Sequence, residues 1–182
     1  MKLFIWFLLL EKIHAISWDI YIPENTFDIM ANCSYTEYKS DNRPDKCDYQ
    51  DAECSYNNEP RVPCEVRRKG SGSWRDMYEK PSFKIKNMEK DGEDYHFGNY
   101  ECSKIYCNPT SKFPNGVNAW TTEKITLNNG VQSRIDIAEV EAYRVFRELG
   151  VIAPLAQKTT LALYRGDTLI SKLDYNMIET IN

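Results

Sequence analysis

Six cysteines limit the folds open to this chain more than any other feature. All six lie between residues 33 and 107 of a 182-residue sequence, and an even number in such a span is typical of a disulfide framework. A metal site is the competing interpretation, but the chain has no C-x-x-C pair and only two histidines, His14 and His96. The sequence therefore predicts three disulfides, without choosing the pairing among Cys33, Cys47, Cys54, Cys64, Cys102 and Cys107.

Residues 1–15 have the pattern of a secretory signal peptide. Lys2 precedes the unbroken apolar run Leu3–Leu10, and Ala15 is a small residue near the expected cleavage point. A buried N-terminal strand or helix is the alternative. The run is shorter than the about 20 apolar residues that cross a bilayer, and no other long apolar stretch follows. We therefore expect a secreted, extracellular protein with no membrane span, in a compartment that favours disulfides.

One glycosylation sequon is present, Asn32-Cys33-Ser34. It suits the surface of a secreted protein and makes Asn32 the candidate acceptor. A disulfide at Cys33 could hinder the modification.

Charge is unevenly distributed along the chain. Residues 16–60 carry ten acidic and three basic side chains, whereas residues 61–90 carry nine basic and four acidic ones. The whole chain has a net charge of −4, so its balance is not that of a nucleic-acid-binding protein. The basic segment instead suggests a local site for an anion such as phosphate.

The hydrophobic pattern predicts an α+β fold with a mostly antiparallel sheet and one main helix. The helix is expected at about 134–149, where Val140, Tyr143, Phe146 and Leu149 recur at helical spacing before Gly150 ends it. Residues 36–60 are expected to be a disulfide-held loop, and residues 87–118 mostly loop. Strands are expected at residues 18–22, 62–69, 82–86, 124–127, 159–164 and 175–181, the last two joined by a turn near Gly166. We divide the chain into a signal peptide (1–15), an N-terminal strand with an acidic Cys-rich loop (16–60) and a further domain (61–182).

A small-residue turn at residues 70–73 lies between two basic strands. Backbone N–H groups in such a turn can bind phosphate oxygens, and lysines alternating onto one strand face can neutralise their charge. The alternative is an ordinary solvated hairpin. The pattern is neither a Walker A loop nor the G-x-G-x-x-G of ordinary protein kinases.

These residues resemble the CotH family of secreted and spore-coat atypical kinases. The first matching block is Lys69-Gly70-Ser71-Gly72-Ser73-Trp74 with the segment 80–86. The second is Leu127-Asn128-Asn129 with the helix that follows it. The third is the pair of strands that leads to Glu179. Together the three blocks cover about residues 61–182.

The resemblance implies that this chain corresponds to the ATP-binding N-lobe of a kinase-like fold. The residues it implies for contact with the nucleotide are Lys69, Gly70, Gly72, Lys80, Lys84, Lys86, Glu139 and Glu179, with Glu141 as the alternative helix glutamate. Solvated lysines and surface pairs between the glutamates and Arg144 are the ordinary alternatives. ATP with Mg would be the cofactor of a complete domain.

The sequence departs from the family at several positions. Ser133 takes the place of an aspartate, Ala138 that of an arginine, and the segment 171–175 blurs the usual approach to the final glutamate. The family's catalytic and metal-binding aspartates lie beyond Glu179 and have no counterpart here. One functional hypothesis is therefore a secreted CotH-like nucleotide-binding fragment, inactive as a kinase when alone. The other is a non-catalytic secreted module that binds a secreted or cell-surface protein.

Overall fold

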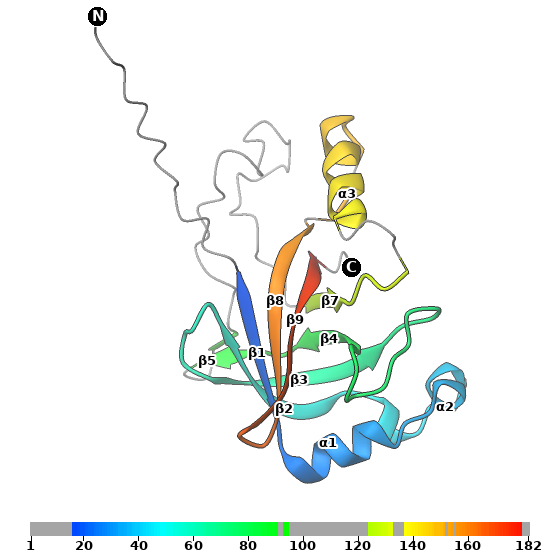
Figure 1. The fold of residues 1–182 in the computed structure, drawn as a ribbon, viewed down its shortest axis with the longest axis vertical. Coiled ribbons are helices and arrows are strands. Elements are labelled where there is room, and N and C mark those ends of the chain that lie inside the picture. The colour runs from blue at the N-terminus through cyan, green and yellow to red at the C-terminus, as the bar shows by residue number, and fades with distance from the viewer. Residues whose placement is uncertain are drawn as a thin grey trace, which may run out of the picture.

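The strands of this chain close into a seven-stranded β-barrel (Figure 1). The computed structural model describes residues 16–90, 93–94, 124–132, 137–151, 153–154 and 156–179. The barrel strands are β1 (Ser17–Ile22), β2 (Gln50–Tyr56), β3 (Val62–Lys69), β4 (Ser82–Lys86), β7 (Lys124–Asn128), β8 (Ala156–Arg165) and β9 (Thr168–Glu179). A separate two-stranded sheet consists of β5 (Glu89–Lys90) and β6 (Glu93–Asp94).

The order of strands around the barrel is β1-β2-β3-β4-β7-β9-β8. Six neighbouring pairs are antiparallel, and the seventh, β1 with β8, is parallel. In this parallel pair Trp18 lies opposite Leu161. After β7 the chain passes through helix α3 to β8 and then returns as β9, which inserts between β7 and β8.

The interior of the barrel is a packed core of side chains. Along β3 the residues alternate between buried and partly exposed, as expected for a strand with one face inward. Trp18 and Tyr175 are the largest fully buried residues. The Trp18 indole N–H lies 2.9 Å from the Met177 sulfur, and the Tyr175 hydroxyl donates to the Pro81 carbonyl at 2.9 Å. Because these side chains fill the interior, as in other small barrels, a ligand site has to be sought on the outer surface.

Among the described residues, three α-helices and one short 3-10 helix lie outside the barrel. They are α1 (Glu24–Ala31), α2 (Tyr35–Lys39), η1 (Asp45–Cys47) and α3 (Ala138–Glu148). Helix α1 begins directly after Pro23 and packs Phe27 and Met30 against the main core. It lies at the bottom of Figure 1, whereas α3 projects at the top. No helix within the described ranges has the length and apolarity needed to cross a bilayer.

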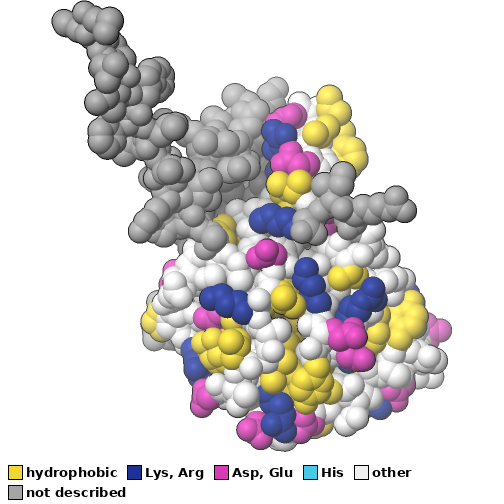
Figure 2. All heavy atoms as spheres, viewed as in Figure 1, with side chains coloured by type: hydrophobic (Ala, Val, Ile, Leu, Met, Phe, Trp, Pro, Cys, Tyr) yellow, Lys and Arg dark blue, Asp and Glu magenta, His cyan; other side chains and the backbone are white. Residues whose placement is uncertain are grey.

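Helix α3 contacts the barrel through a narrow face. Val140 packs with Ala156 and Ile178 in a small cluster that is separate from the main core, and Tyr143 covers its edge. Phe146 and Leu149, which recur at the same helical spacing as Val140 and Tyr143, are 46% and 74% exposed. Figure 2 shows apolar side chains along the free flank of this helix. Of the four residues at helical spacing, Val140 and Tyr143 therefore make the contact with the barrel.

The predicted fold class is wrong: this is a closed mixed β-barrel and not the α+β N-lobe of a kinase-like fold. Two features account for the difference. The first is the parallel pairing of β1 with β8, which joins two strands far apart in sequence and closes the sheet. The second is that the one long helix covers only part of the outer surface, while the main core lies inside the barrel.

Several strand predictions were confirmed. Strands β1, β3, β4 and β7 lie where they were expected, within one residue, and the turn between β8 and β9 includes Gly166. The prediction of a loop over residues 36–60 was wrong. This segment contains the end of α2, the 3-10 helix η1 and all of β2, whose inward residues include Ala52 and Cys54. Most of the expected loop at 87–118 lies outside the described residues.

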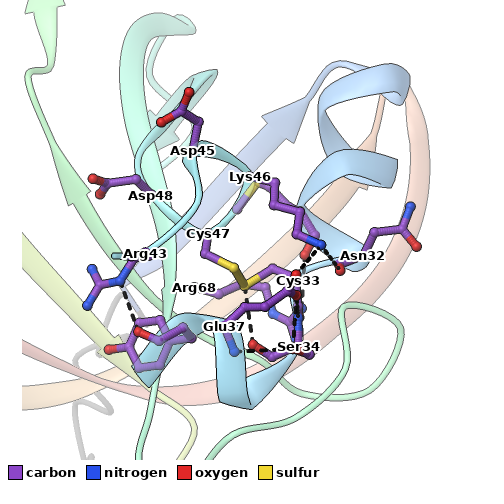
Figure 3. Close-up of a disulfide and its surroundings, with 12 residues drawn as sticks. Asn32, Cys33, Ser34, Glu37, Arg43, Asp45, Lys46, Cys47, Asp48 and Arg68 are labelled. Atoms are coloured by element: carbon purple, nitrogen blue, oxygen red, sulfur yellow. Dashed lines mark hydrogen bonds and ion pairs between the residues drawn. A yellow bond between two sulfur atoms is a disulfide. The ribbon is translucent and has the colours of Figure 1, made fainter. Parts of the chain in front are cut away.

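The described residues contain two disulfides, Cys33–Cys47 and Cys54–Cys64 (Figure 3 shows the first). Cys54–Cys64 joins neighbouring strands β2 and β3, and Cys33–Cys47 ties the end of α1 to η1. Cys102, Cys107 and the expected signal peptide lie outside the described residues. Two such bonds are typical of an extracellular or otherwise oxidising compartment.

Candidate functional site: a basic face beside helix α3

Four cations share the outer surface of three neighbouring strands. We define the basic face as Arg67 and Lys69 on β3, Lys84 on β4 and Lys124 on β7. Arg67 is directly opposite Lys84 in the strand register, and Lys69 is diagonally opposite Lys84. All four side chains are half-buried, so their charges lie against the barrel wall and are only partly hydrated.

The cations of the basic face repel one another. Burial lowers the pKa of Lys69, and the positive charge of Lys84 lowers it further, while Glu139 acts in the opposite direction. Burial also lowers the pKa of Lys84, and here the neighbouring charges are Arg67 and Lys124. Among the described residues no carboxylate offsets the charge of Lys84. An anion on this face would offset both the burial of these positive charges and their mutual repulsion.

Arg67 is held in place by neighbours outside the basic face. Its guanidinium lies 3.2 Å from a carboxylate oxygen of Asp48 and stacks 4.6 Å from the ring centre of Tyr49. It therefore forms a fixed edge of the basic face, whereas Lys69 and Lys84 are its more available charges.

Glu139 is the carboxylate whose charge acts on Lys69, and two asparagines fix it. The Asn128 amide donates to its two oxygens at 2.8 and 3.0 Å, and the Asn176 amide donates at 2.9 Å. These bonds attach the first turn of α3 to β7 and β9. Glu141, the alternative helix glutamate, pairs with Arg144 on the helix surface instead. Of the two helix glutamates, it is therefore Glu139 whose charge acts on Lys69 and raises its pKa.

Asn129 organises the turn at residues 70–74. This buried side chain donates to the carbonyls of Ser73 and Lys80, at 2.9 and 2.6 Å. Its backbone N–H donates to the Ser82 hydroxyl at 2.9 Å. Asn129 therefore joins both ends of the β3–β4 connection to the end of β7, next to the basic face.

The two glycines of this turn have separate roles. Gly70 has a φ of +141°, a conformation that other residues rarely adopt, and a β-carbon there would lie 2.9 Å from the Trp74 nitrogen. A β-carbon at Gly72 would collide with the Gln132 side chain. The turn thus packs directly against the segment that follows β7, and these blocks, which the sequence placed far apart, lie together.

The remaining predicted residues lie elsewhere or have other partners. The Lys86 ammonium pairs with Glu65 at 2.8 Å and lies over the Tyr49 ring, so it is not a free phosphate ligand. The Lys80 ammonium lies 5.4 Å from the ring centre of Tyr175. The backbone of Glu179 pairs with Ile125 at the end of β9, and its side chain is outside the described set. Asn32 is exposed at the end of α1.

Sequence reasoning missed several residues that build the site. Asn128, Asn129 and Asn176 were not given roles, and Arg67 and Lys124 were not included among the candidate ligands. A signal existed for the first two, because two consecutive asparagines directly after an apolar strand are typical of a hydrogen-bonded strand end. No signal in the sequence placed Asn176 beside Glu139.

The chemistry of this face is that of an anion site. Lysine and arginine side chains bind phosphate through charge-assisted hydrogen bonds. No group of three or more His, Cys, Asp or Glu side chains suited to a metal ion occurs in the described part of the chain. No protein-family model matches the chain, and no curated protein matches its sequence. The function is therefore argued from the geometry.

Proposed function

We propose that this chain is a secreted, non-catalytic binding module that holds a phosphate group of its ligand on the basic face. The observation that carries the proposal is the pair Lys69 and Lys84, half-buried on adjacent strands; within the part of the chain that the structure describes, Glu139 offsets the charge of Lys69 and no carboxylate offsets that of Lys84. Such an arrangement is costly without an anion and favourable with one. The expected ligand is a phosphorylated secreted or cell-surface protein.

A nucleotide is the second candidate ligand, and the interaction of Lys69 with Glu139 favours it. A lysine offset by a helix glutamate is what the CotH resemblance implies for a nucleotide-binding lobe. The triphosphate would occupy the same lysines as a phosphorylated side chain. Against it, the Tyr49 ring beside the basic face is already in contact with the cationic groups of Arg67 and Lys86, so it offers no free stacking surface for a base.

The experiment is a binding titration of the full chain with a phosphoserine peptide, the same peptide unphosphorylated, and ATP. We expect the phosphopeptide to bind and the unphosphorylated peptide not to bind. Lys69→Met or Lys84→Met should each weaken binding by roughly 10-fold or more, the usual effect of losing a hydrogen bond to a charged group.

Lys172→Met is the matched control, because Lys172 is an exposed lysine on β9 whose loss changes the net charge equally. It should change the affinity less than twofold. Preferential binding of ATP would favour the nucleotide over the phosphoprotein. Equal effects of all three substitutions, or no binding of any phosphate compound at millimolar concentration, would refute the basic face as the site.

A further inference from the structure

Arg68 lies directly beside the basic face in sequence but points the other way. It is 3% exposed, a rare position for an arginine. Its guanidinium donates to the carbonyls of Met30 and Cys33, at 3.0 and 3.2 Å, and to the carbonyl of Arg75. One side chain therefore connects the end of α1, the first cysteine of a disulfide and the far end of the turn at 70–74.

Trp74 continues this connection. Its ring lies 4.2 Å from the Arg68 guanidinium carbon and 4.8 Å from the ring centre of Tyr38 on α2. Arg43 covers the Tyr38 ring at 4.7 Å. A chain of ring and guanidinium contacts between α2 and the turn thus joins Arg43, Tyr38, Trp74 and Arg68.

The Cys33–Cys47 disulfide fixes the segment that carries this stack (Figure 3). Within the loop it closes, Lys46 pairs with Glu37 at 2.7 Å and donates to the Asn32 carbonyl. Ser34 and Glu37 form a reciprocal cap at the start of α2. Without the disulfide, the Cys33 carbonyl that accepts from Arg68 would no longer be tied to η1.

The turn at 70–74 is therefore held from two sides. Trp74 and Arg68 fix it to the disulfide-closed loop, and Asn129 fixes it to the strand end beside Glu139. Lys69 is the residue between Arg68 and Gly70, so its position depends on both attachments.

We propose that Arg68 is a positioning residue for the basic face, and that through it the Cys33–Cys47 disulfide sets the affinity of Lys69 and Lys84 for phosphate. The inference rests on the proposed function for its affinity readout. A buried guanidinium that loses its carbonyl partners cannot stay in place, because an unpaired buried charge is strongly unfavourable. Lysine cannot replace it, since a single ammonium lacks the planar fork that spans three carbonyls.

The test compares two double variants with one disulfide removed in each. Cys33→Ser with Cys47→Ser opens the loop that contacts Arg68. Cys54→Ser with Cys64→Ser, the matched control, opens the cross-link between β2 and β3, which joins neither the segment 33–47 nor the turn at 70–74. Both are expected to lower the melting temperature, and affinity for the phosphoserine peptide is measured well below both midpoints.

We expect the Cys33/Cys47 double variant to bind the phosphopeptide at least fivefold more weakly than the wild type. The Cys54/Cys64 double variant should bind it less than twofold more weakly. Arg68→Lys, in the otherwise unchanged chain, should weaken binding as the Cys33/Cys47 double variant does. Equal affinities in the two double variants, with the wild type binding normally, would overturn the inference and leave the proposed function intact.

Amide hydrogen exchange of the turn supplies a second readout that needs no ligand. Exchange at residues 70–75 should accelerate in the Cys33/Cys47 variant and in Arg68→Lys, and stay unchanged in the Cys54/Cys64 variant. Unchanged exchange in all variants would overturn the positioning role whatever the binding result. If the wild type binds no phosphate, the proposed function fails and the link from the disulfide to affinity fails with it.

Discussion

Lys84 lies diagonally across from Lys69 on the outer surface of the barrel, and its positive charge helps to hold the pKa of Lys69 below that of an ordinary lysine. The register of β3 and β4 keeps both side chains on one face, so the two lysines cannot move apart without disrupting the pairing of these strands. A ligand that brings negative charge between them removes the repulsion. This relationship makes the site testable by pH as well as by substitution.

Phosphate binding should depend on pH in a bell-shaped manner. A phosphate monoester gains its second charge near pH 6, so affinity should rise through that range. Affinity should then fall on the alkaline side at a pH below 10.5, because Lys69 and Lys84 have lowered pKa values and lose their charge early. Burial is the main cause of both lowered pKa values; the charge of Lys84 adds to it at Lys69, where Glu139 opposes it, and the charges of Arg67 and Lys124 add to it at Lys84.

Titrations of the phosphoserine peptide between pH 5 and pH 10.5 would measure this profile. In Lys84→Met the alkaline fall should move to higher pH, because Lys69 no longer faces that charge. An alkaline limb at the same pH in this variant would show that Lys69 does not take part.

Glu139 should have opposite effects on binding and on stability. Glu139→Gln removes the negative charge that competes with an anion for Lys69, so we expect affinity for phosphate to rise about two- to threefold. Glu139→Ala removes the acceptor of two asparagine amides, one of them from buried Asn176, and should lower stability by about 1–3 kcal/mol. Chemical denaturation and peptide titration measure the two effects.

Glu141→Gln is the control for both measurements, because Glu141 pairs with Arg144 away from the barrel. Glu141→Gln should change the affinity for the peptide and the free energy of unfolding only slightly. A loss of affinity in Glu139→Gln equal to that of Lys69→Met would mean that Glu139 supports the ligand and does not compete with it.

The barrel core and helix α3 should differ sharply in their contribution to stability. Ile20→Ala removes a fully buried side chain of β1 and should lower the free energy of unfolding by about 2–5 kcal/mol. Leu149→Ala, just after α3, removes an apolar side chain that is 74% exposed and should change it by less than about 0.5 kcal/mol. Urea denaturation of both variants measures the difference. Similar losses would show that α3 packs against more of the molecule than Val140 and Tyr143 reach.

Asn32 should carry a glycan when the chain is made in a eukaryotic secretory pathway. Asn32 is exposed, and its side chain points away from the Cys33–Cys47 disulfide (Figure 3), which suits a glycan acceptor. The glycan would appear as an increase in mass that an N-glycosidase removes. Asn32→Gln should abolish this increase. Ser34→Thr, which keeps the sequon and a capping hydroxyl, should retain it. Absence of any increase in the wild type would indicate that the disulfide forms first.

The sequence predicted strands and turns that are set by neighbouring residues. It did not predict the pairing of distant strands that closes the barrel. Strands β3 and β4 follow from strict alternation, and Gly166 marks the turn before β9. Helix α1 was missed although Pro23, Glu24 and the buried pair Phe27 and Met30 have helical start and spacing. The parallel pairing of β1 with β8 leaves no mark in local patterning, because either edge of a sheet presents the same backbone groups.

The candidate site was predicted in the same uneven way. Lys69, Lys84 and Glu139 were selected from motifs, and the structure places them together on one surface. Lys86 was selected from the same alternation, yet Glu65 lies opposite it on β3 and forms an ion pair with it. Which lysine of an alternating strand stays available depends on the cross-strand partner, and that partner is set by the register.

The parallel pairing of Trp18 with Leu161 also has a consequence for how the protein is made. During synthesis, the first strand leaves the ribosome long before its partner β8 exists, so one edge of the growing sheet has no neighbour for most of translation. Contacts between such distant residues slow folding and leave strand edges open to association with other chains. We expect productive folding to begin only after β8 and β9 have emerged, and its yield to fall steeply as the concentration of newly made chains rises.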